Sequence, residues 1–360
     1  MELDAYRQTL QPIETKLLGF LRTFEKLQEE IQFAQVSGAQ QQLQAAAAGL
    51  FPQLTTELAA LTPPEAQREF HAQLSEAAAA LSDSYQLFLG GSGRQFAEAF
   101  LNSRNRLCRA LYVLYEVRAE LPGLAAYWVL PETLPRLAAL ETRPAGVEAP
   151  VGFFQQPRTE RHMQYTLYVP EAYSPEQSWP LIVCLHGGYG RGDEYIWTWL
   201  RPAKSNGYLL LSPKSAGPTW SVLNPPLDVV SIQAMVEEVC AAYAVDRKRV
   251  FLTGLSDGGT FTYLAGLSCP ELFAGAAVIA GDLNPTTDPL LRRKQGIALP
   301  LAVIHGVKDF IFDVRSVRQS CDLLKHIGYQ VAYTELPEWG HALTYSINER
   351  LVLPWFESLR

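Results

Sequence analysis

The sequence lacks paired cysteines, long apolar runs and clusters of basic residues. Its five cysteines are scattered and odd in number, with no Cys-x-x-Cys pair, which argues against a disulfide framework and predicts reduced thiols. No apolar stretch approaches the roughly 20 residues that a membrane-spanning helix needs. Acidic side chains outnumber basic ones by 37 to 30, and the net charge of −7 makes nucleic acid and anionic membrane surfaces unsuited as partners.

Signals for export and for metal binding are also lacking. Residues 1–4 lead directly into charged, amphipathic sequence without a basic start and an apolar core, so we expect no secretory signal. His71 lies alone among alanines and glutamines, with no second ligand at a metal-binding spacing. We therefore expect a cytoplasmic protein that binds no metal and needs no cofactor.

Apolar residues in the first 140 positions recur at helical spacing. The first stripe consists of Ile13, Leu17, Leu21, Phe24, Leu27 and Ile31. A Gly-Gly-Ser-Gly break at 90–93 separates two later helices. Because each helix has one apolar face to cover, residues 1–140 are predicted to form a bundle with its own core. Nothing in the bundle points to chemistry, and we expect it either to narrow access to a site in the rest of the chain or to join two copies as a homodimer.

Residues 141–150 carry two prolines and a glycine, which is typical of a domain boundary. From residue 151 to 360, short apolar runs alternate with helical segments, as in a mostly parallel, doubly wound α/β sheet. The expected strands are 163–169, 180–185, 208–211, 250–253, 276–280, 301–304 and 331–335, and the clearest helices are 229–243 (capped by Asp228), 259–267, 314–326 and one from about Thr344. Ligands of such sheets bind at the carboxyl ends of the strands, so chemistry is expected there.

Ser256 follows the apolar run 249–253 within the motif Gly254-Leu255-Ser256-Asp257-Gly258-Gly259. This pattern is typical of a nucleophile elbow, a sharp strand-to-helix turn in which the residues two before and two after the serine have no room for a β-carbon. Gly254 and Gly258 occupy those positions. The turn would raise the Ser256 hydroxyl above the sheet and leave the Asp257 amide facing a developing oxyanion.

The base is found by elimination among six histidines. Three of them do not follow a strand: His71, His162 and His326. His186 and His305 each close an apolar run directly before a glycine, where an imidazole usually braces the loop. Only His341 lies in a loop beyond the last predicted strand, and we expect it to be the catalytic base.

Three aspartates that follow strands compete for the role of the acid. Asp309 lies a few residues past its strand and is favoured. Asp313 begins a helical pattern and would serve as its N-cap, whereas Asp282 follows the preceding strand, where some enzymes of this architecture carry their acid. The order Ser256, Asp309, His341 is the nucleophile, acid, histidine order of α/β-hydrolases.

Four motifs carry a resemblance to a known family: Leu-His-Gly-Gly at 185–188, Gly-Leu-Ser-Asp-Gly-Gly at 254–259, His-Gly-Val-Lys-Asp at 305–309 and Gly-His at 340–341. With these motifs, residues 151–360 resemble the α/β-hydrolase superfamily, and within it the phospholipase/carboxylesterase and polyhydroxybutyrate-depolymerase-like esterases. The resemblance implies an α/β-hydrolase fold and an acyl-enzyme on Ser256. It also implies that the amides of Asp257 and Gly188 bind the oxyanion, with Tyr189 as the alternative second donor.

The loops after the strands are rich in aromatic residues. Trp197 and Trp220 are candidates for the apolar wall of a substrate pocket, although both residue types are also ordinary core material. Three functions stay open: a serine esterase for small to medium acyl substrates, a serine peptidase or other amide hydrolase, and a binding protein with a secondary hydrolase domain. The complete set of serine, aspartate and histidine favours the first.

Overall fold

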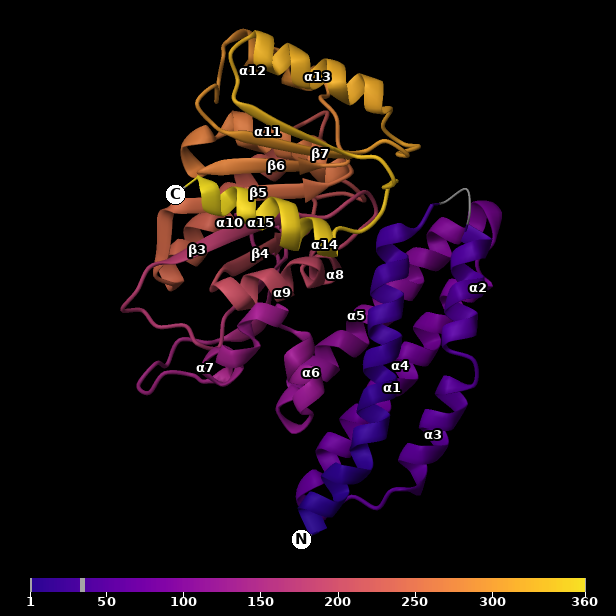
Figure 1. The fold of residues 1–360 in the computed structure, drawn as a ribbon. Coiled ribbons are helices and arrows are strands. Elements are labelled where there is room, and N and C mark those ends of the chain that lie inside the picture. Colours follow the sequence, from indigo (N-terminus) through magenta and orange to yellow (C-terminus); the bar gives the residue numbers. More distant parts are fainter. Residues whose placement is uncertain (1, 33–35, 360) are drawn as a thin grey trace. The chain divides into compact units, whose positions relative to one another are not determined.

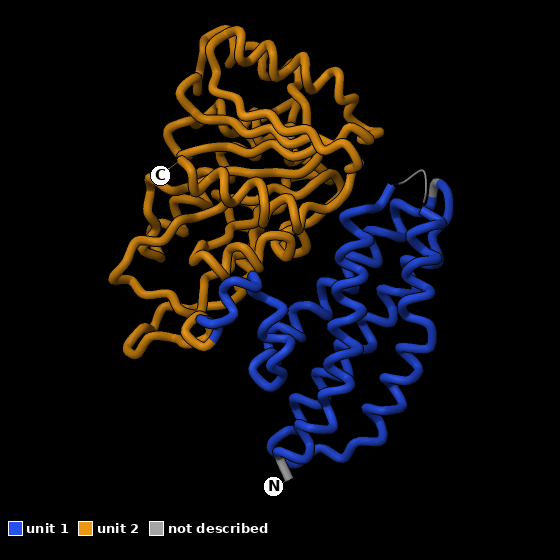
Figure 2. Tube along the Cα trace, in the orientation of Figure 1, with its two compact units in different colours: residues 1–137 blue, residues 138–360 orange. Residues whose placement is uncertain are grey.

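A computed structural model describes residues 2–32 and 36–359. The chain divides into two compact units, residues 1–137 (the helical unit) and residues 138–360 (the sheet unit), as Figure 2 shows. The division falls just before the predicted boundary at 141–150. Val147 and Ala149, inside that boundary segment, pack against the core of the sheet unit. Residues 141–150 therefore lie with the sheet unit, and the independent folding of residues 1–140 stays a prediction.

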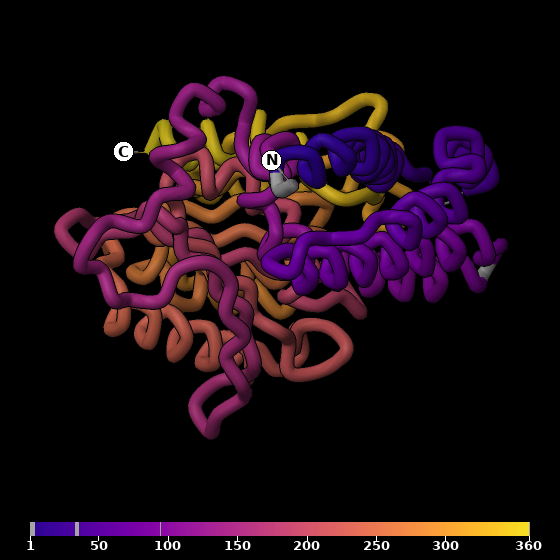
Figure 3. The backbone as a smooth tube through the Cα atoms, turned by 90° about the horizontal axis from the view of Figure 1, so that it is seen from below, coloured from indigo at the N-terminus to yellow at the C-terminus, as the bar shows by residue number. Residues whose placement is uncertain are grey.

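The helical unit is built from helices of very different length. They are α1 (Glu2–Glu30), α2 (Val36–Ala46), α3 (Leu50–Ala60), α4 (Arg68–Gly90), α5 (Phe96–Glu116) and α6 (Pro122–Tyr127), with 3₁₀ turns at Glu65–Gln67, Gly93–Gln95, Arg118–Glu120 and Pro131–Arg136. The helices α4 and α5 lie side by side (Figures 1 and 3). The helical character of this region, and the break near 90–93 between α4 and α5, are as the sequence predicts.

Aromatic rings from four helices form the core of the helical unit. Neighbouring ring centroids lie 5.0–5.5 Å apart in the series Phe51, Phe20, Phe24, Phe88 and Phe96. The apolar stripe predicted for the first helix is buried in this core. Such ring pairs add to the stabilisation that comes from removing their apolar surface from water.

Two buried polar pairs cross between helices of this unit. The Ser84 hydroxyl of α4 donates to the Ser103 carbonyl at 2.8 Å, and the Ser103 hydroxyl of α5 donates to the Ser84 carbonyl at 2.7 Å. The Arg104 guanidinium donates to the Gln28 side-chain oxygen at 2.9 Å. These groups satisfy one another inside the bundle, which is what buried polar groups require.

The sheet unit is organised around a twisted sheet that has eight strands in the described part of the chain. They are β1 (Gly152–Gln156), β2 (Tyr165–Val169), β3 (Trp179–Leu185), β4 (Leu209–Pro213), β5 (Val245–Leu255), β6 (Gly275–Ile279), β7 (Leu301–Gly306) and β8 (Val331–Leu336). Their order is β1-β2-β4-β3-β5-β6-β7-β8; β2 runs antiparallel to β1 and to β4, and the other neighbours are parallel. This arrangement is the α/β-hydrolase fold that the sequence predicts.

Helices cover both faces of the sheet (Figure 1). The helices that follow α6 in the chain are α7 (Leu137–Glu141), which spans the division between the units, and α8 (Gly192–Tyr195), α9 (Trp197–Asn206), α10 (Pro226–Ala242), α11 (Asp257–Ser268), α12 (Asp288–Arg292), α13 (Val314–His326), α14 (Tyr345–Ile347) and α15 (Leu353–Ser358), with a π-helical turn at Asn348–Val352. Alternation along β5 separates the faces: Phe251 stacks on Phe356 of α15 at 4.5 Å, whereas Leu252 belongs to the core that includes residues of α10, α11 and α13.

The seven predicted strands correspond to β2 to β8, and β1 is the strand that sequence reasoning missed. It is a half-exposed edge strand of five residues. Its place depends on antiparallel pairing with β2. An edge strand needs no continuous apolar run, so its sequence gives little signal.

Candidate active site

Ser256 lies between the end of β5 and the first residue of α11, in a strained backbone conformation with φ 60° and ψ −123°. A β-carbon on Gly254 would lie 2.3 Å from the Gly258 carbonyl oxygen, and one on Gly258 would lie 2.4 Å from the Leu185 carbonyl oxygen. Only glycine fits at either position. The turn is therefore held by close backbone contacts on both sides of the serine, as the motif predicts.

The structure brings the three predicted side chains into one hydrogen-bonded line. The His341 Nε2 atom lies 2.8 Å from the Ser256 hydroxyl, and its Nδ1 atom lies 2.8 Å from the Asp309 carboxylate. Because a carboxylate only accepts, Nδ1–H donates to Asp309, and Nε2 is left to accept the Ser256 proton. Ser256 is 9% exposed and the Asp309 side chain is fully buried.

Asp309 is fixed by its own loop as well as by His341. Its Oδ1 atom accepts the amides of Ile311 at 2.8 Å and Phe312 at 3.0 Å. Burial raises the pKa of Asp309, but the hydrogen bond from His341, the charge of that imidazole and the two amides together leave the pKa below the ordinary value of 3.8. His305 braces the same loop, with Nε2 2.9 Å from the Phe312 carbonyl oxygen.

The two competing aspartates are engaged elsewhere. The Asp282 carboxylate accepts the hydroxyls of Ser316 at 2.5 Å and Ser320 at 2.6 Å, both on α13. Asp313 caps α13 by accepting the Arg315 amide at 2.8 Å, as the sequence predicts. Asp309 is the aspartate that meets His341.

The backbone amides beside Ser256 can donate hydrogen bonds to a negatively charged oxygen. Asp257 is the first residue of α11, and in the described part of the chain its amide and that of Gly188 donate to no carbonyl. Gly188 lies so close that a β-carbon on it would be 2.5 Å from the Asp257 carboxylate. The Tyr189 amide instead donates to the Pro218 carbonyl at 2.8 Å, so the alternative second donor is already occupied.

A loop at 214–222 holds this side of the site in place. The Thr219 hydroxyl donates to the Asp257 carboxylate at 2.5 Å. The loop is tied down by Asp228, whose carboxylate accepts the amides of Ala216 at 2.9 Å and Ser221 at 2.8 Å. The prediction that Asp228 caps its helix is wrong, because α10 already begins at Pro226 and the carboxylate serves the loop instead.

Trp197 and Trp220, the predicted pocket wall, are core residues. They are 3% and 2% exposed. The Trp220 Nε1 atom donates to the His186 carbonyl at 2.7 Å, and its ring stacks on Phe261 at 5.3 Å. Trp220 thus holds the loop before Gly188 from its buried side. Neither tryptophan exposes enough surface to bind a substrate.

Sequence reasoning overlooked two exposed apolar residues beside the hydrogen-bonded line of Ser256, His341 and Asp309, which is called the relay below. Phe310 is 60% exposed and Ile311 is 53% exposed, directly after the acid. The Phe310 ring lies edge to face with His341, at a centroid distance of 6.3 Å. The sequence did carry a signal for them: two bulky apolar residues directly follow the acid, in a loop that leaves the sheet.

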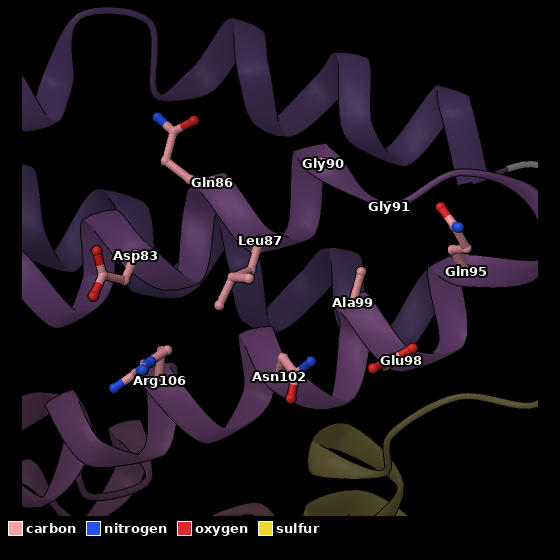
Figure 4. A pocket seen from close by; sticks show the side chains of 10 residues that line it. All are labelled: Asp83, Gln86, Leu87, Gly90, Gly91, Gln95, Glu98, Ala99, Asn102 and Arg106. Atoms are coloured by element: carbon pink, nitrogen blue, oxygen red, sulfur yellow. The ribbon is translucent and has the colours of Figure 1, made fainter.

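Other parts of the described chain offer no comparable chemistry. Within those residues no group of three or more His, Cys, Asp or Glu side chains is arranged to hold a metal ion. In the same residues, no helix combines the length and the apolar character needed to cross a membrane. A groove of about 640 Å³ lies between α4 and α5 (Figure 4), and its lining of carboxylates, amides and Arg106 contains no nucleophile paired with a base.

The chain is similar to several esterases. Residues 228–350 match the family model described as phospholipase/carboxylesterase. A probable feruloyl esterase C of Aspergillus niger is 28% identical over 188 residues, which cover 49% of this chain and 66% of that protein. Acyl-protein thioesterase 1 of Gibberella zeae is 31% identical over 98 residues, covering 26% of this chain and 42% of that protein.

A bifunctional acetylxylan esterase/xylanase of Neocallimastix patriciarum is 25% identical over 158 residues, covering 42% of this chain and 22% of that protein. The chain thus spans between 22% and 66% of the length of these three relatives. Among solved structures, a thermostable esterase has a TM-score of 0.47 at 26% identity, covering 57% of this chain and 62% of the other. Residues 228–350 therefore match the phospholipase/carboxylesterase family, within a sheet unit that has the α/β-hydrolase fold.

Proposed function

We propose that this protein hydrolyses carboxylic esters of small to medium acyl groups through an acyl-enzyme on Ser256. The observation that carries the proposal is the unbroken line of hydrogen bonds from Ser256 through His341 to Asp309, with 2.8 Å at each step. Such a line activates an otherwise weak alcohol nucleophile. The family match and the esterase relatives support ester substrates.

In the first half-reaction, His341 takes the Ser256 proton while Oγ attacks the ester carbonyl carbon. The amides of Asp257 and Gly188 stabilise the negative charge on the carbonyl oxygen; in the described part of the chain, neither of them donates to a carbonyl. His341 then gives its proton to the alcohol oxygen, and the carbon–oxygen bond to the alcohol breaks. Asp309 holds the imidazole in the required tautomer throughout.

In the second half-reaction, water attacks the acyl-enzyme with His341 again as the base. The tetrahedral intermediate collapses, the acid is released and Ser256 recovers its proton from His341. The segment between β6 and β7 holds only a 3₁₀ turn and the five-residue helix α12. It supplies no helical lid, which favours small substrates over esters at lipid interfaces.

We also propose that the protein works in the cytoplasm. All five of its cysteines are free thiols, and four of them are buried. A protein folded in an oxidising compartment more often pairs its cysteines. Fractionation of source cells, with activity and antibody followed together, tests the location.

A fluorophosphonate probe tests the serine chemistry. It should label the protein at a single peptide containing Ser256, and the Ser256→Ala variant should stay unlabelled. Nitrophenyl esters of increasing acyl length, run beside aminoacyl anilides, then separate an esterase from an amide hydrolase. Faster turnover of the anilides would make the chain a peptidase, and absence of both labelling and turnover would make the site a binding site.

A further inference from the structure

The position of Phe310 and Ile311 bears on which esters the site accepts. Both follow the acid directly, and both are more than half exposed. Phe312, the next residue, packs against the core of the sheet unit instead. The turn held by the Asp309 carboxylate and the amides of Ile311 and Phe312 fixes where the side chains on either side of it lie.

The chemistry of the relay decides which part of a substrate lies next to this pair. His341 Nε2 must reach first the Ser256 hydroxyl and then the oxygen of the departing alcohol. The oxyanion points the other way, toward the amides of Asp257 and Gly188. The alcohol half of the ester therefore lies on the His341 side of the site, which is the side where the Phe310 ring stands edge to face with the imidazole.

The surroundings of this pair favour an apolar group over a charged one. The charged residues next to the pair along the loop all have partners: the buried Asp309 carboxylate accepts from His341, Lys308 forms an ion pair with Glu338, and Asp313 lies 3.5 Å from the Arg315 guanidinium. Val307, at the start of the loop, is also exposed. Large apolar side chains exposed together beside a reactive group are typical of a ligand-contacting surface.

We propose that Phe310 and Ile311 bind the alcohol half of the substrate. The enzyme then prefers esters of large apolar alcohols to esters of small alcohols. Large apolar alcohols also compete with water for the acyl group on Ser256. This inference rests on the proposed acyl-enzyme. An alcohol R′OH bound beside Phe310 gives its proton to His341 and attacks the acyl carbon, the bond to Ser256 Oγ breaks, and Ser256 regains that proton; the product is the ester of R′OH, and no other reagent is needed.

The test measures how one acyl-enzyme partitions between acceptors. Nitrophenyl butyrate forms the acyl-enzyme in the presence of either benzyl alcohol or methanol, and chromatography gives the amounts of ester and butyric acid. The wild-type protein should favour benzyl alcohol over methanol. Phe310→Ala should lower this preference about tenfold, the expected value of a partly buried aromatic contact, and Phe310→Leu should restore much of it.

Leu323→Ala is the matched control, because Leu323 is also large, apolar and exposed but lies on α13. It should keep the wild-type preference. A second measurement, the ratio of kcat/KM for benzyl butyrate and methyl butyrate with the wild-type protein alone, does not depend on the folding of any variant. It should favour the benzyl ester.

The outcomes separate the two proposals. If nitrophenol is released in a burst but Phe310→Ala keeps the wild-type preference, the alcohol half binds elsewhere and the esterase proposal stands. A wild-type protein that favours methanol, or that makes no ester in either alcohol, overturns the inference in the same way. No burst and no turnover of any ester overturns both.

Discussion

Two buried serines, one in each unit, show how differently the two parts of the chain use the same residue. Ser84 lies in the regular helix α4, and its hydroxyl is satisfied by a carbonyl of α5. Ser256 stands in a strained turn with φ 60°, and its hydroxyl is directed at an imidazole. Burial and polarity are common to both, so neither indicates function. Backbone strain at a strand end, with a base in reach, is what sets Ser256 apart.

The wider distribution of polar groups follows the same division. In the helical unit, buried groups such as Arg104 and Gln28 pair with one another between helices. In the sheet unit, Ser256, Asp309 and His341 meet where β5, β7 and β8 end, because these parallel strands point the same way. The polar contacts between helices fix the packing of the helical unit, whereas those at the strand ends of the sheet unit bring a nucleophile, a base and an acid together. The predictions below test this contrast, beginning with the largest effect.

Replacing Ser256 by alanine should affect activity alone, and replacing Ser84 by alanine should affect stability alone. Ser256→Ala and His341→Ala should each lower ester turnover about 10⁶-fold, with almost no change in melting temperature. Ser84→Ala should leave turnover unchanged and lower the free energy of unfolding by about 1–2 kcal/mol, since the Ser103 carbonyl loses its donor. Kinetics on a nitrophenyl ester and thermal unfolding measure both. Retained turnover in Ser256→Ala, or its unfolding, would contradict the contrast.

The acid is tested by three matched substitutions. Asp309→Asn should lower turnover about 10⁴-fold. The amides of Ile311 and Phe312 would keep the Asn oxygen, so its NH2 group would donate to Nδ1 and favour the wrong tautomer of His341. Asp282→Asn and Asp313→Asn should keep most of the activity, since those carboxylates serve Ser316, Ser320 and the start of α13. Steady-state kinetics of the three variants decide the matter. If Asp282→Asn were inactive and Asp309→Asn active, the assignment of Asp309 as the acid would be wrong.

Buried His186 predicts a loss of stability in mild acid. Burial lowers the pKa of His186 to about 4, while an unfolded histidine titrates near 6.5. Between these values the unfolded chain binds a proton that the folded chain does not, so the contribution is complete above about pH 6.5 and is lost as the pH falls toward 4. The loss amounts to about 3 kcal/mol of unfolding free energy at most.

Chemical denaturation at several pH values measures this loss. In His186→Asn the decline between pH 6.5 and 4 should be smaller, whereas substituting the exposed His326 in the same way should leave it as it is. Equal declines in all three proteins would show that other groups are responsible. A smaller decline in His186→Asn would show what one buried polar group in the loop before Gly188 contributes to the stability of the sheet unit.

Removal of the helical unit should have the smallest effect on chemistry. A chain that begins at Ala138 should keep its turnover of small esters, because the relay lies wholly in the sheet unit. A chain that begins at Pro150 should be less stable by about 1–2 kcal/mol, because it loses Glu141, which lies 3.0 Å from the fully buried Lys204 ammonium. Thermal unfolding and nitrophenyl ester kinetics compare the two truncated chains with the full one.

The same truncated chains test the expected role of the helical unit. If that unit narrows access to Ser256, the chain from Ala138 should accept bulkier acyl groups than the full chain. An unchanged acyl-length profile, together with a change from dimer to monomer in sedimentation, would instead assign the helical unit to dimerisation. Loss of activity in the chain from Ala138 would contradict the separation of the two units.

The sequence by itself determined the fold class, seven of the eight strands found in the described residues, and the nucleophile elbow. These depend on local signals: apolar runs of strand length, and glycines at the two positions beside Ser256 where a β-carbon has no room. Asp313 as a cap was likewise predictable, because a cap needs only its own helix. The order of serine, aspartate and histidine along the chain named the members of the relay before their positions were known.

Tertiary structure decided what depends on residues far apart in sequence. Asp309 rather than Asp282 meets His341, because Asp282 finds two hydroxyls on α13. The Tyr189 amide is occupied by Pro218, and Trp220 turns inward to support His186. In each case a polar group could satisfy its hydrogen bonds in more than one way, and the choice was made by which partner the packed chain brought within reach.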